Sequence, residues 1–133
     1  MLSDDHQINE EALKRILAVK NNIDLTIWEN IRNKFEGDIE TQKEGIRDFF
    51  KFYSQIPYEA NDFLIEFINS DINIEVLRYL ARQYADLETL LPVAFEIELT
   101  SILRDVNDEE IQSLIKIKIK KIDESFLQFW KML

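Results

Sequence analysis

The 133-residue chain contains no cysteine and a single histidine. Without cysteine it has no disulfide, no thiolate nucleophile and no cysteine-based zinc or iron–sulfur site, which suits the reducing cytoplasm. Histidine supplies most general bases near neutral pH, but His6 stands in an acidic N-terminal stretch without a nucleophile beside it. The sequence therefore predicts a cytoplasmic protein and offers little for catalysis.

Recognisable catalytic and metal-binding motifs are also missing. The chain has no glycine-rich phosphate loop, no nucleophile elbow and no zinc-protease motif. On a helix, Glu96 and Glu98 would lie about 200° apart and could not converge on one ion. Asp105, Asn107 and Glu109 have the spacing of an EF-hand start, but the sixth position lacks the required glycine. We therefore expect no enzymatic activity, no cofactor and no metal site.

Glycine and proline are scarce, with two residues of each. So few turn formers disfavour an all-β domain, and apolar residues recur with the helical period of 3.6 throughout the chain. The sequence predicts one all-α domain over residues 1–133, a compact bundle of six to seven helices with residues 1–8 as a flexible tail. Successive helix pairs of similar length are also compatible with a short HEAT-like stack. The expected helices span about 9–20, 24–36, 38–56, 57–69, 74–85, 92–104 and 107–132.

Several positions carry more specific structural expectations. Gly37 should end the second helix in a left-handed conformation, and Gly45, inside a helix, indicates close approach of another helix. Asn107 should cap the last helix. Val93 and Ile97 fall on the opposite face from the other apolar residues of their helix, which predicts that this helix is central and covered on two sides.

Long apolar runs and basic stripes are absent as well. No stretch of about 18 apolar residues occurs, so neither secretion nor membrane spanning is expected. Residues 115–120 alternate isoleucine and lysine, which would also suit an edge strand, although both flanks continue the helical period. On a helix the lysines would scatter around the circumference as a solvated surface, which argues against nucleic-acid binding. These lysines are Lys116, Lys118, Lys120 and Lys121.

The chain has an excess of acid, with a formal net charge of −10. Residues 52–103 hold nine acidic and two basic residues, a net −7, so most of the excess lies in the middle of the chain. Such a field repels nucleic acid and anionic lipid and accelerates encounter with a basic protein. The same acidity would also serve simply to keep the protein in solution.

One expected helix concentrates acid on a single face. Glu59, Asp62 and Glu66 fall within about 60° of one another, with Tyr58 and Ile65 beside them and outside the core stripe. Carboxylates can bind arginine and lysine, and tyrosine is a low-entropy anchor. This face is the predicted binding site for a basic partner. Three further acids are expected to extend it: Glu75, Asp86 and Glu88.

These features predict a non-catalytic protein-binding domain. Its sharper form is an inhibitor or immunity-type protein that neutralises a basic partner, such as a nuclease toxin, through the acidic surface. The alternative is a structural or assembly module that forms homo-oligomers through apolar helix faces. The sequence does not identify the partner or the oligomeric state.

Overall fold

The computed structural model describes residues 23–132, with side chains from residue 23 to residue 125. Six α-helices and one short 3-10 helix occupy this range, and no strand occurs within it. The all-α prediction is confirmed, and residues 115–120 are helical. The expected helix at 9–20, the tail at 1–8 and His6 lie outside the described residues. The elements are α2 (Leu25–Lys34), α3 (Ile39–Lys51), η1 (Tyr53–Gln55), α4 (Glu59–Asn69), α5 (Ile74–Asp86), α6 (Val93–Arg104) and α7 (Glu109–Met132).

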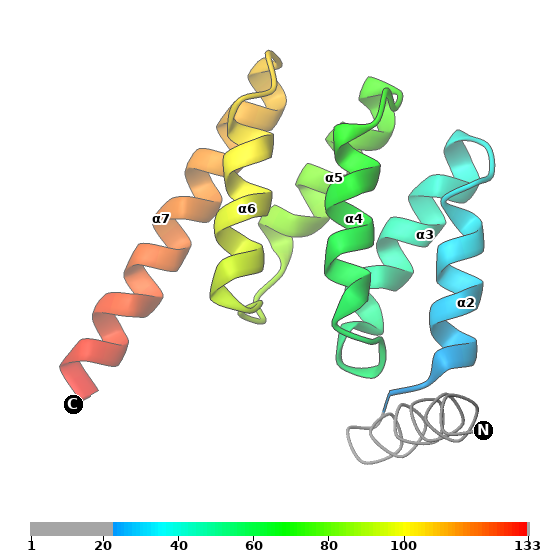
Figure 1. Ribbon diagram of the computed structural model, residues 1–133. Helices are drawn as coiled ribbons and strands as arrows, with labels where there is room; N and C mark the ends of the chain where they lie inside the picture. The colour runs from blue at the N-terminus through cyan, green and yellow to red at the C-terminus, as the bar shows by residue number, and fades with distance from the viewer. Residues whose placement is uncertain (1–22, 133) are drawn as a thin grey trace, which may run out of the picture.

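The six helices form two layers (Figure 1). In that view α2, α4 and α6 stand side by side in a front layer, and α3, α5 and α7 cross behind them in a rear layer. Helices of the front layer run in one direction and those of the rear layer run back. The most extensive packing lies in the rear layer, between α3 and α5 and between α5 and α7. The bundle therefore consists of successive helix pairs that stand side by side.

The central helix of the stack is α5. Leu80, Ala81 and Tyr84 are fully buried in it, because α3 covers one side and α7 covers the other. The sequence predicted the central position for α6, and this prediction is wrong. Val93 and Ile97 on α6 are 73% and 65% exposed, since α6 is the last helix of the front layer.

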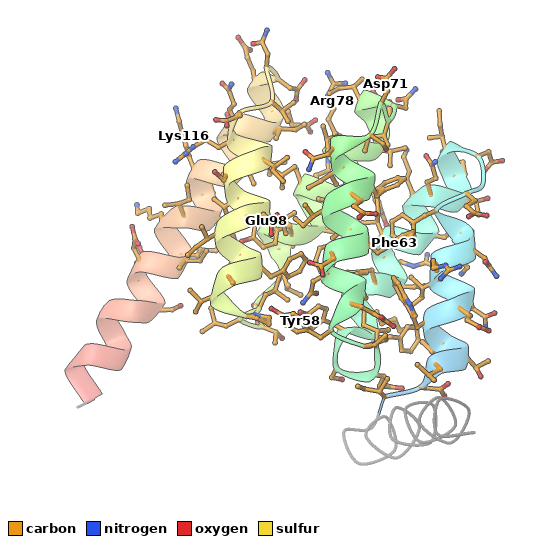
Figure 2. The ribbon with its side chains drawn as sticks, in the orientation of Figure 1. Tyr58, Phe63, Asp71, Arg78, Glu98 and Lys116 are labelled. Atoms are coloured by element: carbon orange, nitrogen blue, oxygen red, sulfur yellow. The ribbon has the colours of Figure 1, made fainter. Side chains whose placement is uncertain are left out.

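Aromatic rings join α2 to α4 within the front layer. Phe63 makes edge contacts with Trp28 and Phe35, at centroid distances of 5.4 and 5.5 Å, and Phe67 meets Phe35 at 4.8 Å. Figure 2 shows Phe63 on the side of α4 that faces α2. Such pairs each contribute about 0.5–1.5 kcal/mol beyond their burial. The contacts on this side of α4 direct its polar residues outward.

Hydrogen bonds to short side chains set the starts of the helices. Asp38 and Asn73 accept backbone N–H groups at the starts of α3 and α5. At α7 the cap is Asp108, whose carboxylate accepts the N–H of Ile111 at 3.1 Å, and not the predicted Asn107 one residue earlier. The error is small because both residues have side chains suited to an N-cap.

The third helix ends earlier than its apolar spacing predicted. It stops at Lys51, and Phe52 (φ −103°, ψ 20°) leads into the 3-10 turn η1 instead of a helix to residue 56. The turn buries Ile56 and lets the carbonyl of Gln55 accept the backbone N–H of Asp24 at 2.6 Å. A 3-10 turn preserves nearly the same apolar spacing as an α-helix, so the pattern does not reveal the change.

Both glycines stand where a side chain would collide. A Cβ on Gly45 would lie 3.1 Å from Cβ of Lys34 and 3.3 Å from the ring of Phe35, which confirms the expected close approach between helices. A Cβ on Gly37 would lie 2.7 Å from Cγ2 of Thr41. The φ angle of Gly37 is outside the left-handed region, so the predicted left-handed conformation is wrong. At position 37 the lack of room for a side chain, and not the backbone conformation, accounts for the glycine.

The close contact at Gly45 yields a stability prediction. Gly45→Leu should lower the free energy of unfolding by about 1–3 kcal/mol, because overpacking between α2 and α3 outweighs the gain of about 1 kcal/mol in helix propensity. The exposed neighbour Glu44→Leu is the control and should change it by less than about 0.5 kcal/mol. Urea unfolding measures both. Equal effects of the two substitutions would contradict the role of Gly45.

Candidate functional site

The acidic face predicted from the sequence exists on α4. Glu59, Asp62 and Glu66 are all exposed, and they belong to the middle helix of the front layer (Figure 1). The helix contains no lysine or arginine. Within the described part of the chain, none of the three carboxylates makes an ion pair. We call these three residues the acidic ridge.

The local sequence explains why the ridge faces outward. The core side of α4 carries Ala60, Leu64 and Ile68, which recur every four residues and are buried. The acids occupy the opposite side of the helix. Glu59 and Asp62 also stand in its first turn, where negative charge is favoured by the helix dipole.

Tyr58 and Ile65 were expected to flank the ridge, and the structure separates them. Tyr58 is 64% exposed at the start of α4, at the lower end in Figure 2, and it is available for binding. Ile65 is only 8% exposed and belongs to the core, so its assignment to the binding surface is wrong. The apolar face is wider than a single helical stripe because α4 lies between α2 and α6. The buried polar Asn61 lies on the same wide face.

The three acids expected to extend the surface lie elsewhere. Glu75 is in the first turn of α5 in the rear layer, and its carboxylate pairs with Arg78 at 2.9 Å. Asp86 is the last residue of α5. Glu88 follows it in the loop to α6 and lines a shallow depression together with Lys118 and Lys121. The structure does not bring these acids together with the ridge.

Three acids in and beside the rear layer, Glu75, Asp108 and Glu110, are paired with arginines of α5. The Arg78 guanidinium binds Asp108 at 2.8 Å, and Arg82 binds Glu110 at 2.7 Å. The hydrogen bond from Arg78 lowers the pKa of Asp108, and the same bond raises the pKa of Arg78. These ion pairs join α5 to Glu110 of α7 and to Asp108, the N-cap of α7. Their acids therefore help to hold the two helices together. The excess negative charge of the middle segment is therefore concentrated on the front layer.

An acid outside the predicted site extends the ridge. Glu98 is exposed on α6, and Figure 2 shows it on the side of α6 that faces α4. Sequence reasoning tested Glu98 only as a metal ligand and missed this position, because the relative orientation of α4 and α6 depends on tertiary packing. The front layer thus presents carboxylates from two neighbouring helices.

A second polar group, buried between α5, α6 and α7, was not anticipated. It consists of Tyr84, Glu96, Thr100 and Lys118, which we call the Tyr84 cluster. The Tyr84 hydroxyl donates to Oε1 of Glu96 at 3.4 Å and lies 3.0 Å from Oγ1 of Thr100. The Lys118 ammonium donates to the backbone carbonyl of Leu87 at 2.6 Å and stands 4.8 Å from the Tyr84 ring centroid.

Burial shifts the proton affinities of this cluster. It raises the pKa of Tyr84 to about 12 and raises the pKa of Glu96, while the nearby Lys118 charge partly offsets the shift of Glu96. Burial also lowers the pKa of Lys118. Lys118 is 3% exposed, so its assignment to a solvated surface is wrong, although Lys116 and Lys120 are exposed. The cluster joins three helices through polar contacts inside the core.

Among residues 23–125, no three histidine, aspartate or glutamate side chains are grouped so that they could hold a metal ion. No helix in the described range has the length and apolarity needed to cross a membrane. The two arrangements that set this structure apart are the exposed acidic ridge and the buried Tyr84 cluster.

Comparison of the chain with known protein families, with curated proteins and with solved structures finds no significant match. Function is therefore argued from the geometry alone.

The raised pKa of Glu96 predicts a pH dependence of stability. The native state binds the Glu96 proton more tightly than the unfolded chain does. The neutral carboxyl therefore stabilises the fold fully at pH values below 4.5, the ordinary pKa of a glutamate. That stabilisation is lost as the pH rises through the folded-state pKa. Glu96→Gln removes the titration, so its unfolding free energy relative to wild type should increase between pH 4 and pH 7.

Urea unfolding at several pH values measures this difference. The exposed neighbour Glu98→Gln is the matched control, and its profile should run parallel to that of the wild type. A parallel profile for Glu96→Gln as well would show that burial of Glu96 does not control its ionisation.

Proposed function

We propose that this protein is a non-catalytic binding module whose acidic ridge engages a basic protein partner. The observation that carries the proposal is the contrast between the two layers. Glu75, Asp108 and Glu110, in and beside the rear layer, are paired with Arg78 and Arg82, whereas Glu59, Asp62 and Glu66 are exposed without an ion pair among the described residues. Exposed carboxylates of one sign from one helix provide the charge that a cationic surface recognises.

The side chains around the ridge suit such a partner. Carboxylates accept paired hydrogen bonds from arginine, and these bonds are shorter and stronger than neutral ones. Tyr58 supplies an exposed aromatic ring beside the acids, and aromatic anchors with few rotatable bonds carry much of the energy of protein interfaces. Glu98 adds a carboxylate from the neighbouring helix. The net charge of −10 would accelerate encounter with a cationic protein.

The sharper form of the proposal is an inhibitor or immunity-type protein that acts in the cytoplasm. A small acidic domain can neutralise a basic enzyme, such as a nuclease toxin, by covering the cationic surface that the enzyme uses for its own anionic substrate. This form of the proposal follows from the charge and size of the domain, by analogy with small acidic inhibitors. It requires no cofactor, no nucleic-acid contact and no membrane contact by this chain.

An assembly module is the second candidate. Its specific support is the apolar edge at the end of the stack, where Val93 and Ile97 are exposed. These two residues belong to α6, and residues of α7 line the groove beside them. The two functions are compatible, because the ridge and the edge occupy different helices.

Charge reversal tests the ridge. The triple variant Glu59→Lys, Asp62→Lys and Glu66→Lys should bind an arginine-rich peptide at least tenfold more weakly than the wild type, because it replaces attraction with repulsion. Titration of isotope-labelled protein, followed by NMR, measures affinity and location together. In the wild type the shifted amides should lie in α4 and near Glu98, and affinity should fall steeply with salt.

A control triple variant separates the ridge from net charge. Glu29→Lys, Glu36→Lys and Glu124→Lys change the total charge by the same amount at exposed positions outside the ridge. This variant should retain most of the affinity. If both variants lose affinity equally, or if the shifted amides are spread over the whole surface, the ridge is not a binding site.

A further inference from the structure

The α6–α7 pair ends the stack with an apolar edge. In a stack of helix pairs, each pair buries its apolar sides against its neighbours. Val93 and Ile97 on the outer side of α6 have no such cover, with exposures of 73% and 65%. Together with α7 they line a groove of about 390 Å³. The residues of α7 that line it are Ile119, Ile122 and Asp123.

The groove has an ordered pattern along α6. Val93, Ile97, Thr100 and Arg104 all line it and follow the three- and four-residue spacing of one helix face. The face is therefore apolar at its start and middle, and it ends in a cation. A solvated outer helix would carry polar residues at all of these positions. Two large exposed aliphatic side chains one turn apart instead indicate a surface that is covered in the working protein.

Opposite charges lie at the two ends of this groove. Arg104 is the last residue of α6. This end of α6 is adjacent to the start of α7 (Figure 1). Asp123 is in the second half of α7, which diverges from α6 toward the lower left in Figure 1, and it lines the groove together with Val93 at the start of α6. Both side chains are exposed, and neither makes an ion pair within residues 23–125. The groove thus has Arg104 at its positive end and Asp123 at its negative end. The stretch between them is mainly apolar and also includes Glu96, Thr100 and Ser101.

We propose that a second copy of this chain docks on the edge, with the two α6–α7 pairs related by a two-fold axis. A two-fold interface requires a self-complementary surface, in which residue i of one copy meets residue j of the other and j meets i. With the axis near Ile97, the apolar centres meet each other. Arg104 of each copy then faces Asp123 of the other copy. A two-fold axis reverses the direction of the groove, so opposite charges at its two ends face each other in the dimer.

The dimensions of the edge set the expected strength of the dimer. α7 has 24 residues and α6 has 12, or roughly 36 Å and 18 Å in length. At about 10 Å per helix the strip offers on the order of 500 Å², less than the roughly 800 Å² that each partner contributes to a standard interface. A reversible dimer that depends on concentration follows. The acidic ridge is on another helix, so this inference does not rest on the proposed function.

Sedimentation velocity over a wide range of protein concentration tests the apolar centre. The wild type should pass from monomer to dimer as concentration rises. Ile97→Glu should weaken dimerisation by on the order of a hundredfold, because it places a charge on the axis against its own copy. The matched control is Ile117→Glu, since Ile117 is 52% exposed on α7 and does not line the groove. It should dimerise like the wild type.

Mixing experiments test the symmetry. Arg104→Asp and Asp123→Arg should each weaken self-association by on the order of tenfold, because like charges then meet at both ends. A one-to-one mixture of these two variants should dimerise as the wild type does, since opposite charges face each other again across the mixed pair. Circular dichroism melts check that the variants fold, as all four substituted positions, including the control at Ile117, are exposed.

Three results would overturn the proposal. They are a wild-type protein that remains monomeric at all concentrations, an Ile97→Glu variant that dimerises like the wild type, and a charge-variant mixture that associates no better than its components. The last result would favour a partner of different sequence or a head-to-tail contact over the two-fold dimer. None of these results bears on peptide binding at the acidic ridge, so the two proposals fail separately.

Discussion

The close packing of α5 between α3 and α7 is the constraint on which the rest of the structure depends. Leu80 and Ala81 are fully buried there, and the small side chain of Ala81 suits a helix with neighbours on two sides. Tyr84 is buried in the same helix, so its hydroxyl needs partners inside the protein. Glu96 and Thr100 on α6 supply them, which ties the front layer to the rear one. The position of α6, and with it the apolar edge, follows from this central packing.

The same arrangement separates the charges of the protein. Arg78 and Arg82 are the only bases between residues 52 and 103, and α5 carries both toward acids at the start of α7. No base from this segment remains for α4, whose ion-pairing partners would have to come from outside the described fold. The acids paired with Arg78 and Arg82 therefore contribute to stability, while the exposed acids of α4 contribute to the surface potential. The excess of acid in residues 52–103 thus becomes an exposed negative surface on the front layer.

The sequence predicted the features that depend on local periodicity. It did not predict burial that depends on which other helices pack against a helix. The helices within the described residues and the close approach at Gly45 follow from spacing and steric size, and they are confirmed apart from the early end of α3. Two burial predictions were wrong in opposite directions. Ile65 was assigned to the surface and is buried, whereas Val93 was assigned to the interior and is exposed. A helical wheel shows which residues share a face but not how many helices cover it. Lys118 was missed for the same reason, because only the fold brings it beside Tyr84 and Leu87.

The proposed dimer and the proposed ridge respond to salt in opposite directions. Two copies of charge −10 at about 30 Å repel by roughly 14 kcal/mol in unscreened water, and a Debye length of about 8 Å at physiological salt reduces this to a few tenths. The two Arg104–Asp123 contacts are worth at most about 1 kcal/mol each, so screening favours association. Binding of a cation by the ridge weakens under the same screening. The edge is the place where two acidic copies can meet, because its own charges cancel and its centre is apolar.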